Sequence, residues 1–340
     1  MKHASKRNHP SSILRKIAIA FSLTIAVSFS GIGITFGYLS SQVNVSRASD
    51  YFITPIFEED ENDDSFEEVE IDRSQAQNIL IIGLDYGLYD GGLNTDTIML
   101  LHIPQDEGRI TLGNFPRDTL VTIPSCLTGD GNITTERTQT MINSAFVIGA
   151  GNAENLHAGT ACLIQTIELA TGASITDHMI LKVDAVEEII DMLGGIEVDL
   201  PEAVEGNHNV ELSLPAGVQR LNGDQSINFI RARGGSGMNL EQGGDLARID
   251  RQHFFMQSAL SSVSLRDLTI PTIATMINSV TVSENLANPL RAFALLQLVF
   301  SSANDSMQFS FVELPTKPFP ENRNRLIFDE QVEEIFANWR

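Results

Sequence analysis

Arginines gather in one short stretch of a chain that is otherwise acidic. Of the 22 lysines and arginines, 15 lie beyond Arg73, and four of these fall between positions 231 and 251. They are Arg231, Arg233, Arg248 and Arg251. Guanidinium groups bind phosphate oxygens in a bidentate fork and keep their charge when partly desolvated. The glycine-rich segment 234–244 would let the two pairs approach one point, which indicates a phosphate site; a salt-bridge network on a solvated helix is the alternative.

A helix over residues 245–252 would arrange further polar groups around the second pair. Asp245, Arg248 and Gln252 would then lie on one face. Arg251 would lie about 120° around the helix from Asp245.

Two aspartates flank a loop that contains three glycines. Asp85 ends one apolar run and Asp96 precedes the next. Carboxylates at strand ends beside such a loop suit a hard divalent cation such as Mg²⁺, although aspartate also serves plain turn chemistry. Arg117 and Asp118 follow a third apolar run. Together, arginines and acids at strand ends suggest a metal-assisted site for a phosphate or pyrophosphate ester.

The elements that would position these groups alternate between strands and helices. Short apolar runs predict strands, and longer periodic segments predict helices. The predicted strands are 78–84, 97–103, 109–115, 178–183, 196–200 and 307–314. The predicted helices are 158–170, 185–193, 224–231, 247–262, 268–277, 289–301 and 330–339. This order favours an α/β fold, a three-layer α/β/α sandwich with a mixed sheet.

The N-terminus has the pattern of a membrane anchor. Residues 1–16 hold five basic and no acidic residues, and residues 17–39 carry no charge. At about 1.5 Å per residue, the second segment is long enough to span a bilayer. A cleaved signal peptide and a buried helix are alternatives, but the apolar segment is long and no A-x-A-like site follows it. We expect an uncleaved signal-anchor at the cell membrane, a single pass with residues 1–16 in the cytoplasm and the rest outside.

Residues 40–73 are predicted to form an acidic spacer before an extracellular domain at 74–340. Ten acids fall within 58–72, and such a run repels itself and stays solvated. The domain has 33 acids against 15 bases, which argues against nucleic-acid binding.

Cys126 and Cys162 are the two cysteines of the chain, and both lie in the predicted external part. An oxidising compartment favours a disulfide between them. Two unpaired buried thiols are the alternative.

The motifs, taken in order, resemble those of the LytR-CpsA-Psr family. The first are Asn78-Ile-Leu-Ile-Ile-Gly-Leu-Asp85, Thr95-Asp96-Thr97-Ile-Met-Leu100, Pro116-Arg117-Asp118-Thr119 and Ile142-Asn143-Ser-Ala145. The later ones are Val183-Asp184 through Asp191-Met-Leu-Gly-Gly195, Leu221-Asn-Gly-Asp-Gln225, Arg231-Ala-Arg233 and Gly244-Asp245-Leu-Ala-Arg248-Ile-Asp-Arg251-Gln252. Each motif alone is weak, but eight in the same order from about residue 78 to 260 are specific. The tail from 311 to 339 is similar to an extension found in some members.

The resemblance implies a transferase of cell-envelope glycopolymers. Its donor would be a glycan on a polyprenyl pyrophosphate, its acceptor peptidoglycan, typically a muramic-acid hydroxyl, and its product a phosphodiester. The implied fold is an α/β/α sandwich with an apolar pocket for the lipid tail. A polyprenyl-pyrophosphate pyrophosphatase and a non-catalytic, membrane-tethered lipid-binding regulator are the alternatives.

The resemblance also implies roles for the site residues. Asp85 and Asp96 would hold Mg²⁺ (or Mn²⁺), and Asp245 would be the base for the acceptor hydroxyl. The residues that would grip the pyrophosphate are Arg117, Arg231, Arg233, Arg248 and Gln252, while Arg251 would join them or support them. Two positions depart from the family pattern: Asn94 stands where many members have arginine, and Met141 where many have lysine. These departures weaken the expected grip on the ligand.

Overall fold

The computed structural model describes most of the chain beyond residue 42. It describes residues 41, 43–53, 76–86, 93–105, 108–207, 210–232, 234–241, 244–262, 279–303 and 308–340. Two compact units are distinguished, Met1–Gln42 and Val43–Arg340, and the fold below is that of the second. Within the described ranges, no helix has the length and apolar character needed to cross a bilayer. The segments predicted at 1–16, 17–39 and 268–277 lie outside the described residues.

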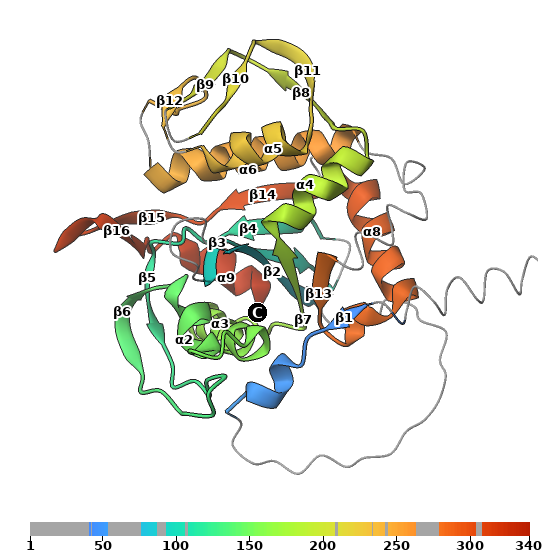
Figure 1. Cartoon of the computed structure of the whole chain (residues 1–340). Helices are drawn as coiled ribbons and strands as arrows, with labels where there is room; N and C mark the ends of the chain where they lie inside the picture. The colour runs from blue at the N-terminus through green and yellow to red at the C-terminus, as the bar shows by residue number, and fades with distance from the viewer. Residues whose placement is uncertain are drawn as a thin grey trace, which may run out of the picture. The chain divides into compact units, whose positions relative to one another are not determined.

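A seven-stranded mixed sheet forms the centre of the domain (Figure 1). Its order is β1 (Asn44–Val45), β13 (Val280–Val282), β7 (Asp177–Lys182), β2 (Gln77–Tyr86), β3 (Leu93–Ile103), β4 (Ile110–Asn114) and β14 (Phe309–Glu313). β2 is parallel to β7 and antiparallel to β3, and β14 is parallel to β4. The predicted mixed α/β arrangement is therefore confirmed for the described residues.

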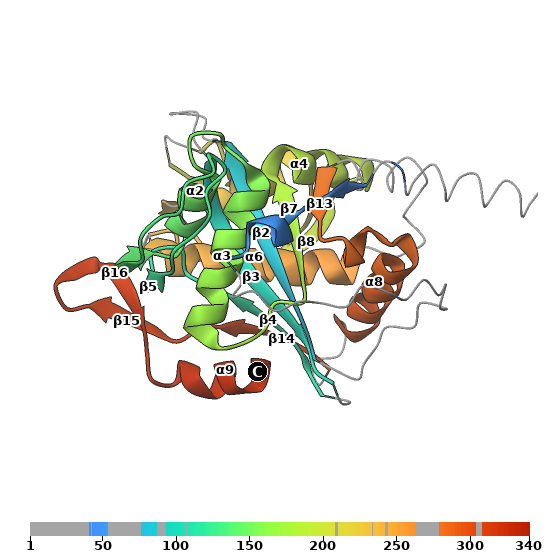
Figure 2. The ribbon, with the colours of Figure 1, turned by 90° about the horizontal axis from the view of Figure 1, so that it is seen from below.

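Helices cover both faces of this sheet (Figures 1 and 2). One face carries α2 (Ser144–Ala150), α3 (Leu156–Thr171) and α9 (Val332–Trp339). The other carries α4 (Val183–Met192), α5 (Gly223–Arg231), α6 (Gly244–Ser262) and α8 (Pro289–Ala303). The strands are continuous apolar runs because each face is covered: Leu80, Ile82 and Leu84 of β2 pack towards α3, and Ile79 packs towards the α8 side.

The predicted strand at 196–200 forms, but outside the central sheet. β8 (Ile196–Leu200) pairs only with β11 (Gly217–Leu221) among the described strands. Its residues alternate between buried and exposed, as expected for a strand that covers the core with one face. A further small sheet joins β9 (Val204–Gly206), β10 (Ser213–Leu214) and β12 (Gly235–Ser236). Both small sheets share a core with Phe229 of α5 and Phe255 of α6, as a layer beyond those helices (Figure 1).

The structure contains two hairpins that the sequence analysis does not predict. The first is β5 (Leu120–Ile123) with β6 (Arg137–Met141), and the second is β15 (Thr316–Phe319) with β16 (Asn322–Phe328). An isolated bridge between Thr119 and Leu326 joins the two. They therefore attach the C-terminal region to the chain that follows β4.

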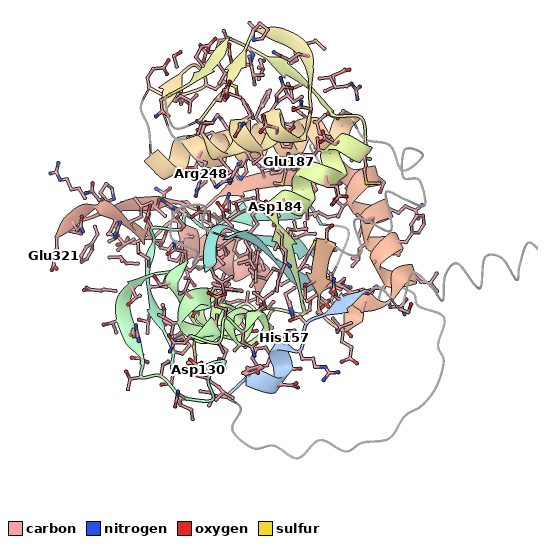
Figure 3. All side chains as sticks on the ribbon, in the orientation of Figure 1. Asp130, His157, Asp184, Glu187, Arg248 and Glu321 are labelled. Carbon is pink, nitrogen blue, oxygen red and sulfur yellow. A yellow bond between two sulfur atoms is a disulfide. The ribbon has the colours of Figure 1, made fainter. Side chains whose placement is uncertain are left out.

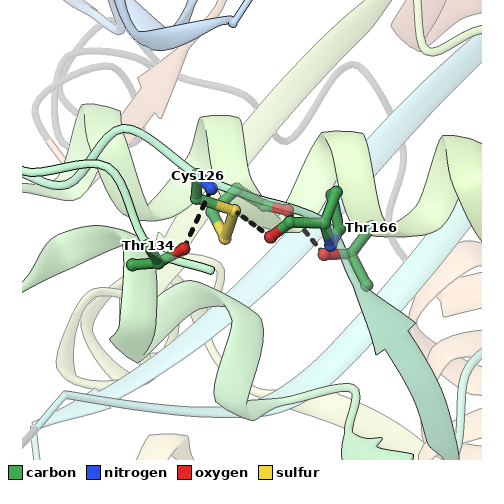
Figure 4. The surroundings of a disulfide bond; sticks show 5 residues. Cys126, Thr134 and Thr166 are labelled. Atoms are coloured by element: carbon green, nitrogen blue, oxygen red, sulfur yellow. Dashed lines mark hydrogen bonds between the residues drawn. A yellow bond between two sulfur atoms is a disulfide. The ribbon is translucent and has the colours of Figure 1, made fainter. Parts of the chain in front are cut away.

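Cys126 and Cys162 form a disulfide, with their Cα atoms 5.4 Å apart (Figure 4). The bond ties the segment after β5 to α3. Thr134 Oγ1 accepts a hydrogen bond from the Cys126 amide at 3.0 Å, and Thr166 Oγ1 donates to the Cys162 carbonyl at 2.7 Å. Closing a loop of this length stabilises the fold by about 4 kcal/mol in the chain-entropy model.

Residues 43–53 belong to the domain, although the sequence assigns them to the spacer. β1 pairs with β13, and η1 (Ala48–Tyr51) packs on α3 with Ala48 buried in the core. Asn155 Nδ2 donates to Tyr51 Oη at 2.8 Å. The remainder of the predicted spacer, 54–73, lies outside the described residues.

Candidate active site

Asp85 and Asp96 come from neighbouring antiparallel strands. Asp85 is the second-last residue of β2, as expected for a strand end. Asp96 lies inside β3, not before it, because β3 begins at Leu93. Asp85 is opposite Asn94 in the register, so the two aspartates differ by two residues along the strand pair. Their side chains are therefore within about 8 Å of each other along the sheet.

A β-bulge turns Asp96 towards the helices that carry the arginines. The pairing runs from Gly83↔Thr97 directly to Leu84↔Thr95, which makes Asp96 the extra residue of β3. Thr95 donates its hydroxyl to the Asn143 carbonyl, at the start of α2, at 3.0 Å. Without the extra residue, Asp96 would share the face of Ile98, in the core on the α3 side. The bulge instead lets Asp96 and Thr97 both contact α6.

Gly83 makes the close strand pairing possible. A Cβ added at Gly83 would lie 2.8 Å from Thr97 Cβ, which is too close for two carbon atoms. Any other residue there would push β3 away just beside the bulge. Gly83 therefore sets the spacing on which the position of Asp96 depends.

Arg117 follows β4 in a tight turn and contacts Asp96. The Phe115 amide donates to the Ile98 carbonyl at 2.9 Å, and the Thr119 amide donates to the Pro116 carbonyl at 3.0 Å. The Arg117 guanidinium donates to the Asp96 carboxylate, and its Nε lies 3.7 Å from Asp118 Oδ2. Arg117 thus sits between two carboxylates at the end of β3 and β4.

Arg248 reaches the same aspartate from α6 (Figure 3). Its Nη2 donates to the Asp96 main-chain carbonyl at 2.9 Å, and its Nη1 lies 3.7 Å from Asp96 Oδ2. The side chain is only 3% exposed, whereas that of Asp96 is 27% exposed. Two arginines from distant segments therefore converge on one carboxylate.

Arg231 is the last residue of α5 and binds the other carboxylate. A capping box fixes the start of this helix, where the Asn222 side chain accepts from the Gln225 amide and the Gln225 side chain returns to the Asn222 amide. At the far end, Arg231 Nη2 donates to Asp85 Oδ2. Because 36% of the Arg231 side chain is exposed, it can still contact a ligand.

Gln252 lies one helical turn beyond Arg248 and faces the same strands. It accepts from Asn114 Nδ2 at 3.3 Å and donates to Thr97 Oγ1 at 3.4 Å. The side chain is therefore adjacent to Asp96, at the edge of the group of charges. Its expected contact with a ligand stays a prediction.

Arg251 takes a different position from the one predicted for a ligand-binding arginine. It is 1% exposed, and its guanidinium donates to the Ala232 carbonyl and, at 3.3 Å, to the Met238 carbonyl. These carbonyls bracket the loop between Arg231 and α6, in which Met238 has a φ of 46° and Gly237 one of 83°. Burial, and secondarily the charge of Arg248, lowers the pKa of Arg251 to about 10. Arg251 stabilises the loop, so the structure supports the second of the two expected roles.

For three positions named in the sequence analysis, the structure describes no side chain. Arg233 is outside the described residues, and so are the side chains of Asp245, in the first turn of α6, and of Asn94. Met141 ends β6, opposite Leu120 of β5. The site also contains a residue that the sequence analysis did not single out, Arg325 of β16, whose Nη1 lies 3.4 Å from Asp118 Oδ1. Its only sequence signal was its place in the C-terminal extension.

Asp85 and Asp96 are the acidic side chains that the sequence analysis assigns to a divalent cation. Among the described residues, no cluster of three or more histidines, cysteines and acids could hold a metal by itself. Asp85 and Asp96 offer oxygen ligands on adjacent strands, 15% and 27% exposed. Mg²⁺ is usually bound by one or two carboxylates together with waters and the oxygens of a phosphate ligand. The two carboxylates fit a cation that arrives with a phosphate.

Comparisons with known proteins agree on one family. The model of the LytR_cpsA_psr family matches residues 50–335. The chain is 30% identical over 196 residues to the probable cell wall biosynthesis protein LcpB of Corynebacterium glutamicum, covering 56% of this chain and 41% of that protein. It is 29% identical over 194 residues to the polyisoprenyl-teichoic acid–peptidoglycan teichoic acid transferase TagU of Oceanobacillus iheyensis, covering 56% and 53%. The chain spans about half the length of these curated relatives.

Solved structures show the same fold. The LytR-Csp2A-Psr enzyme from Actinomyces oris superposes with a TM-score of 0.55 at 23% identity, covering 77% of this chain and 89% of that one. TagV of Bacillus subtilis gives a TM-score of 0.55 at 22% identity, covering 78% and 97%. The mixed sheet with helices on both faces is thus a known α/β fold. Because the family model covers most of its length, the chain belongs to the LytR_cpsA_psr family.

Proposed function

We propose that this protein transfers a glycopolymer from a polyprenyl-pyrophosphate carrier to peptidoglycan. One observation carries the proposal: three arginines converge on two aspartates, Arg117 and Arg248 on Asp96 and Arg231 on Asp85. These residues come from distant segments, since Asp85 and Arg248 are 163 positions apart in the sequence. A cluster with more arginine than aspartate suits a ligand that carries several negative charges. Relatives named as teichoic acid transferases support the choice of reaction.

The reaction would be a displacement at phosphorus. The acceptor hydroxyl oxygen bonds to the phosphorus that bears the glycan, and the bond from that phosphorus to the bridging oxygen breaks. Polyprenyl monophosphate leaves with the bonding electron pair, and the hydroxyl proton passes to a base, for which we propose Asp245. The product joins glycan and acceptor through a phosphodiester.

The chain's own residues would stabilise the charge that grows on the leaving group. In the ligand-free state, Arg117, Arg231 and Arg248 are paired with carboxylates. A pyrophosphate offers the same fork geometry with more charge, so the guanidiniums exchange partners when it binds. A Mg²⁺ (or Mn²⁺) on Asp85 and Asp96 would supply further charge neutralisation and compensate the carboxylates that the arginines leave.

We further propose that residues 17–39 anchor the domain at the outer face of the cell membrane. The proposal rests on the uncharged segment and on the five bases before it. An anchor of this kind would keep the site close to the lipid carrier. Protease added to intact protoplasts should digest the domain, and protection of the domain until the membrane is opened would overturn this topology.

Reconstitution tests the activity directly. The full chain in detergent micelles, supplied with polyprenyl-pyrophosphate glycan, Mg²⁺ and peptidoglycan fragments, should yield the phosphodiester-linked product. Release of free glycan phosphate without transfer would show a pyrophosphatase, and binding without turnover would show a lipid-binding regulator. Asp96→Asn should lose the activity, while Arg220→Ala, in the separate β8–β11 sheet, should keep it.

A further inference from the structure

The C-terminal hairpin β15–β16 is attached directly beside the arginine cluster. The Leu326 amide donates to the Asp118 carbonyl at 3.2 Å, and Leu326 bridges to Thr119. Arg325 Nη1 lies 3.4 Å from Asp118 Oδ1, and Asp118 in turn contacts Arg117. Charges of alternating sign therefore run from Asp96 through Arg117 and Asp118 to Arg325.

The hairpin is basic in an acidic chain, with Lys317, Arg323 and Arg325 against one acid, Glu321. Phe328 packs edge-on against Phe115 and Phe336, with ring centroids 6.3 Å and 5.3 Å apart, which fixes the base of β16 on the core. Arg323 and Arg325 stand two residues apart on β16, towards its exposed end. Arg323 is exposed, and among the described residues no carboxylate pairs with it. Glu321 marks the outer end of the hairpin, away from Arg248 (Figure 3).

The hairpin approaches Arg117 from the side of the sheet opposite to α5 and α6. Phe328 packs on the core cluster that includes α3, whereas Arg231 and Arg248 come from the other layer. If the proposed function holds, the pyrophosphate donor is gripped from the α5 and α6 side. The side of the sheet that carries the β15–β16 hairpin then remains for the second substrate, the acceptor.

The charge of the hairpin identifies the chemistry of that substrate. The chain has a formal net charge of −22, so an anionic saccharide is repelled by most of its surface. Arg325 already holds a carboxylate, that of Asp118, and it is 34% exposed. A ligand carboxylate can take the same position by a simple exchange of partners.

We propose that the β15–β16 hairpin forms the acceptor side of the site, where Arg323 and Arg325 bind a carboxylate-bearing saccharide. The inference rests on the proposed function and assigns its acceptor contacts.

Acceptor kinetics test this proposal in the full chain in detergent, with a short peptidoglycan fragment that carries free carboxylates. Arg325→Ala and Arg323→Glu should each raise the acceptor KM roughly tenfold, the effect of losing one charge-assisted hydrogen bond. The donor KM and the kcat at saturating acceptor should stay unchanged. Arg325→Lys should restore part of the loss, and Arg220→Ala should have no effect. With an acceptor whose carboxylates have been amidated, wild type and variants should be equally weak.

Binding of a fluorescent acceptor fragment without donor separates this proposal from the proposed function. If wild type binds the fragment and Arg323→Glu does not, the acceptor surface stands even where no transfer is found. An unchanged acceptor KM in both variants, or a raised donor KM in its place, would overturn the assignment. So would equal binding of free and amidated fragments to wild type.

Discussion

Ion pairs between arginine and aspartate lie at both ends of the central sheet, and the balance of charge differs between the two ends. At the start of β7, the fully buried Asp177 carboxylate accepts from Ser283 Oγ at 2.6 Å and pairs with Arg291 at 3.0 Å. Arg291 Nη2 also lies 3.5 Å from Gln77 Oε1. One carboxylate therefore faces one guanidinium, and hydrogen bonds occupy both. We call this group the Asp177 pair.

At the other end of β2, positive charge is in excess. Among the described side chains, the carboxylates that act on these guanidiniums are Asp85, Asp96, Asp118 and Asp250, whereas the guanidiniums are Arg117, Arg231, Arg248, Arg251 and Arg325. These groups are partly exposed, apart from Arg248 and Arg251. The eight residues from Gln77 to Asp85 separate the two ends by roughly 25 Å, at the rise of an extended strand.

The difference separates a structural role from a binding role for the same residue types. A buried carboxylate with one counter-ion has its charge balanced without a ligand, and the Arg291–Asp177 pair holds β7 to α8. An excess of guanidinium repels itself, so an anion that enters lowers the energy of the group. The comparison predicts that damage to the first end reduces stability, while damage to the second reduces activity.

The largest effect on stability is expected from Arg291→Ala. Removing it leaves the Asp177 carboxylate buried without its counter-ion, which costs about 3–5 kcal/mol of unfolding free energy. Urea unfolding followed by the fluorescence of Trp339, the single tryptophan and a buried one, measures this loss. Asp177→Asn combined with Arg291→Ala should recover part of it, because no unpaired charge remains. Equal stability of wild type and Arg291→Ala would contradict a stabilising role for the Arg291–Asp177 pair.

At the site end, Arg231→Ala should lower kcat/KM for transfer by roughly 10²–10³-fold, as for loss of one fixed donor to developing charge. The unfolding free energy should change by less than about 0.5 kcal/mol, because this partly exposed pair with Asp85 is worth little. Arg231→Lys should recover little activity, since an ammonium is a point charge without the guanidinium fork. Arg220→Ala is the control for loss of a surface arginine. A large loss of stability with full activity per folded molecule would contradict the assignment.

The sequence predicts the central strands well because strands buried on both faces consist of continuous apolar residues. β2, β3 and β4 are covered on both sides, and they appear as the apolar runs 78–84, 97–103 and 109–115. β6 and much of β16 are exposed or half-buried, so they show no apolar period. β8 has a clear strand pattern, but the sheet to which it belongs depends on its partner β11, 21 residues away. Pairing of that kind is not a local property.

For the site, residue types could be predicted but not every role. The chemistry of Asp85, Arg117, Arg231 and Arg248 follows from their positions at element ends, and the structure brings these four together in two groups. The bulge that directs Asp96 has no local signal, because it arises from the register between two strands. Arg251 differs from Arg248 only in its direction around α6, and the loop that covers it decides its role.

Arg251→Met should lower both the stability of the fold and the turnover. The Ala232 and Met238 carbonyls would lose their donor, which costs about 2 kcal/mol of unfolding free energy. Turnover should fall because Arg231, next to Ala232, is no longer held. A double-mutant cycle with Arg231→Ala should give a coupling energy of at least about 0.5 kcal/mol. Additive effects would show that Arg251 does not act through Arg231.

The smallest effect concerns pH and arises beside Asp177. His178, next to Asp177, is buried, and desolvation, aided by the charge of His157, lowers its pKa to about 4. Between pH 4 and about 6.5 the unfolded chain therefore binds a proton that the folded chain does not, so acidification favours unfolding. At pH 5.5 this histidine should cost about 1.4 kcal/mol relative to pH 7.5. His178→Leu should flatten the dependence, leaving the share of His102 and His253, whose pKa values burial also lowers. Unfolding curves at pH 7.5 and 5.5 test this, and an unchanged pH dependence in His178→Leu would show that His178 is not its cause.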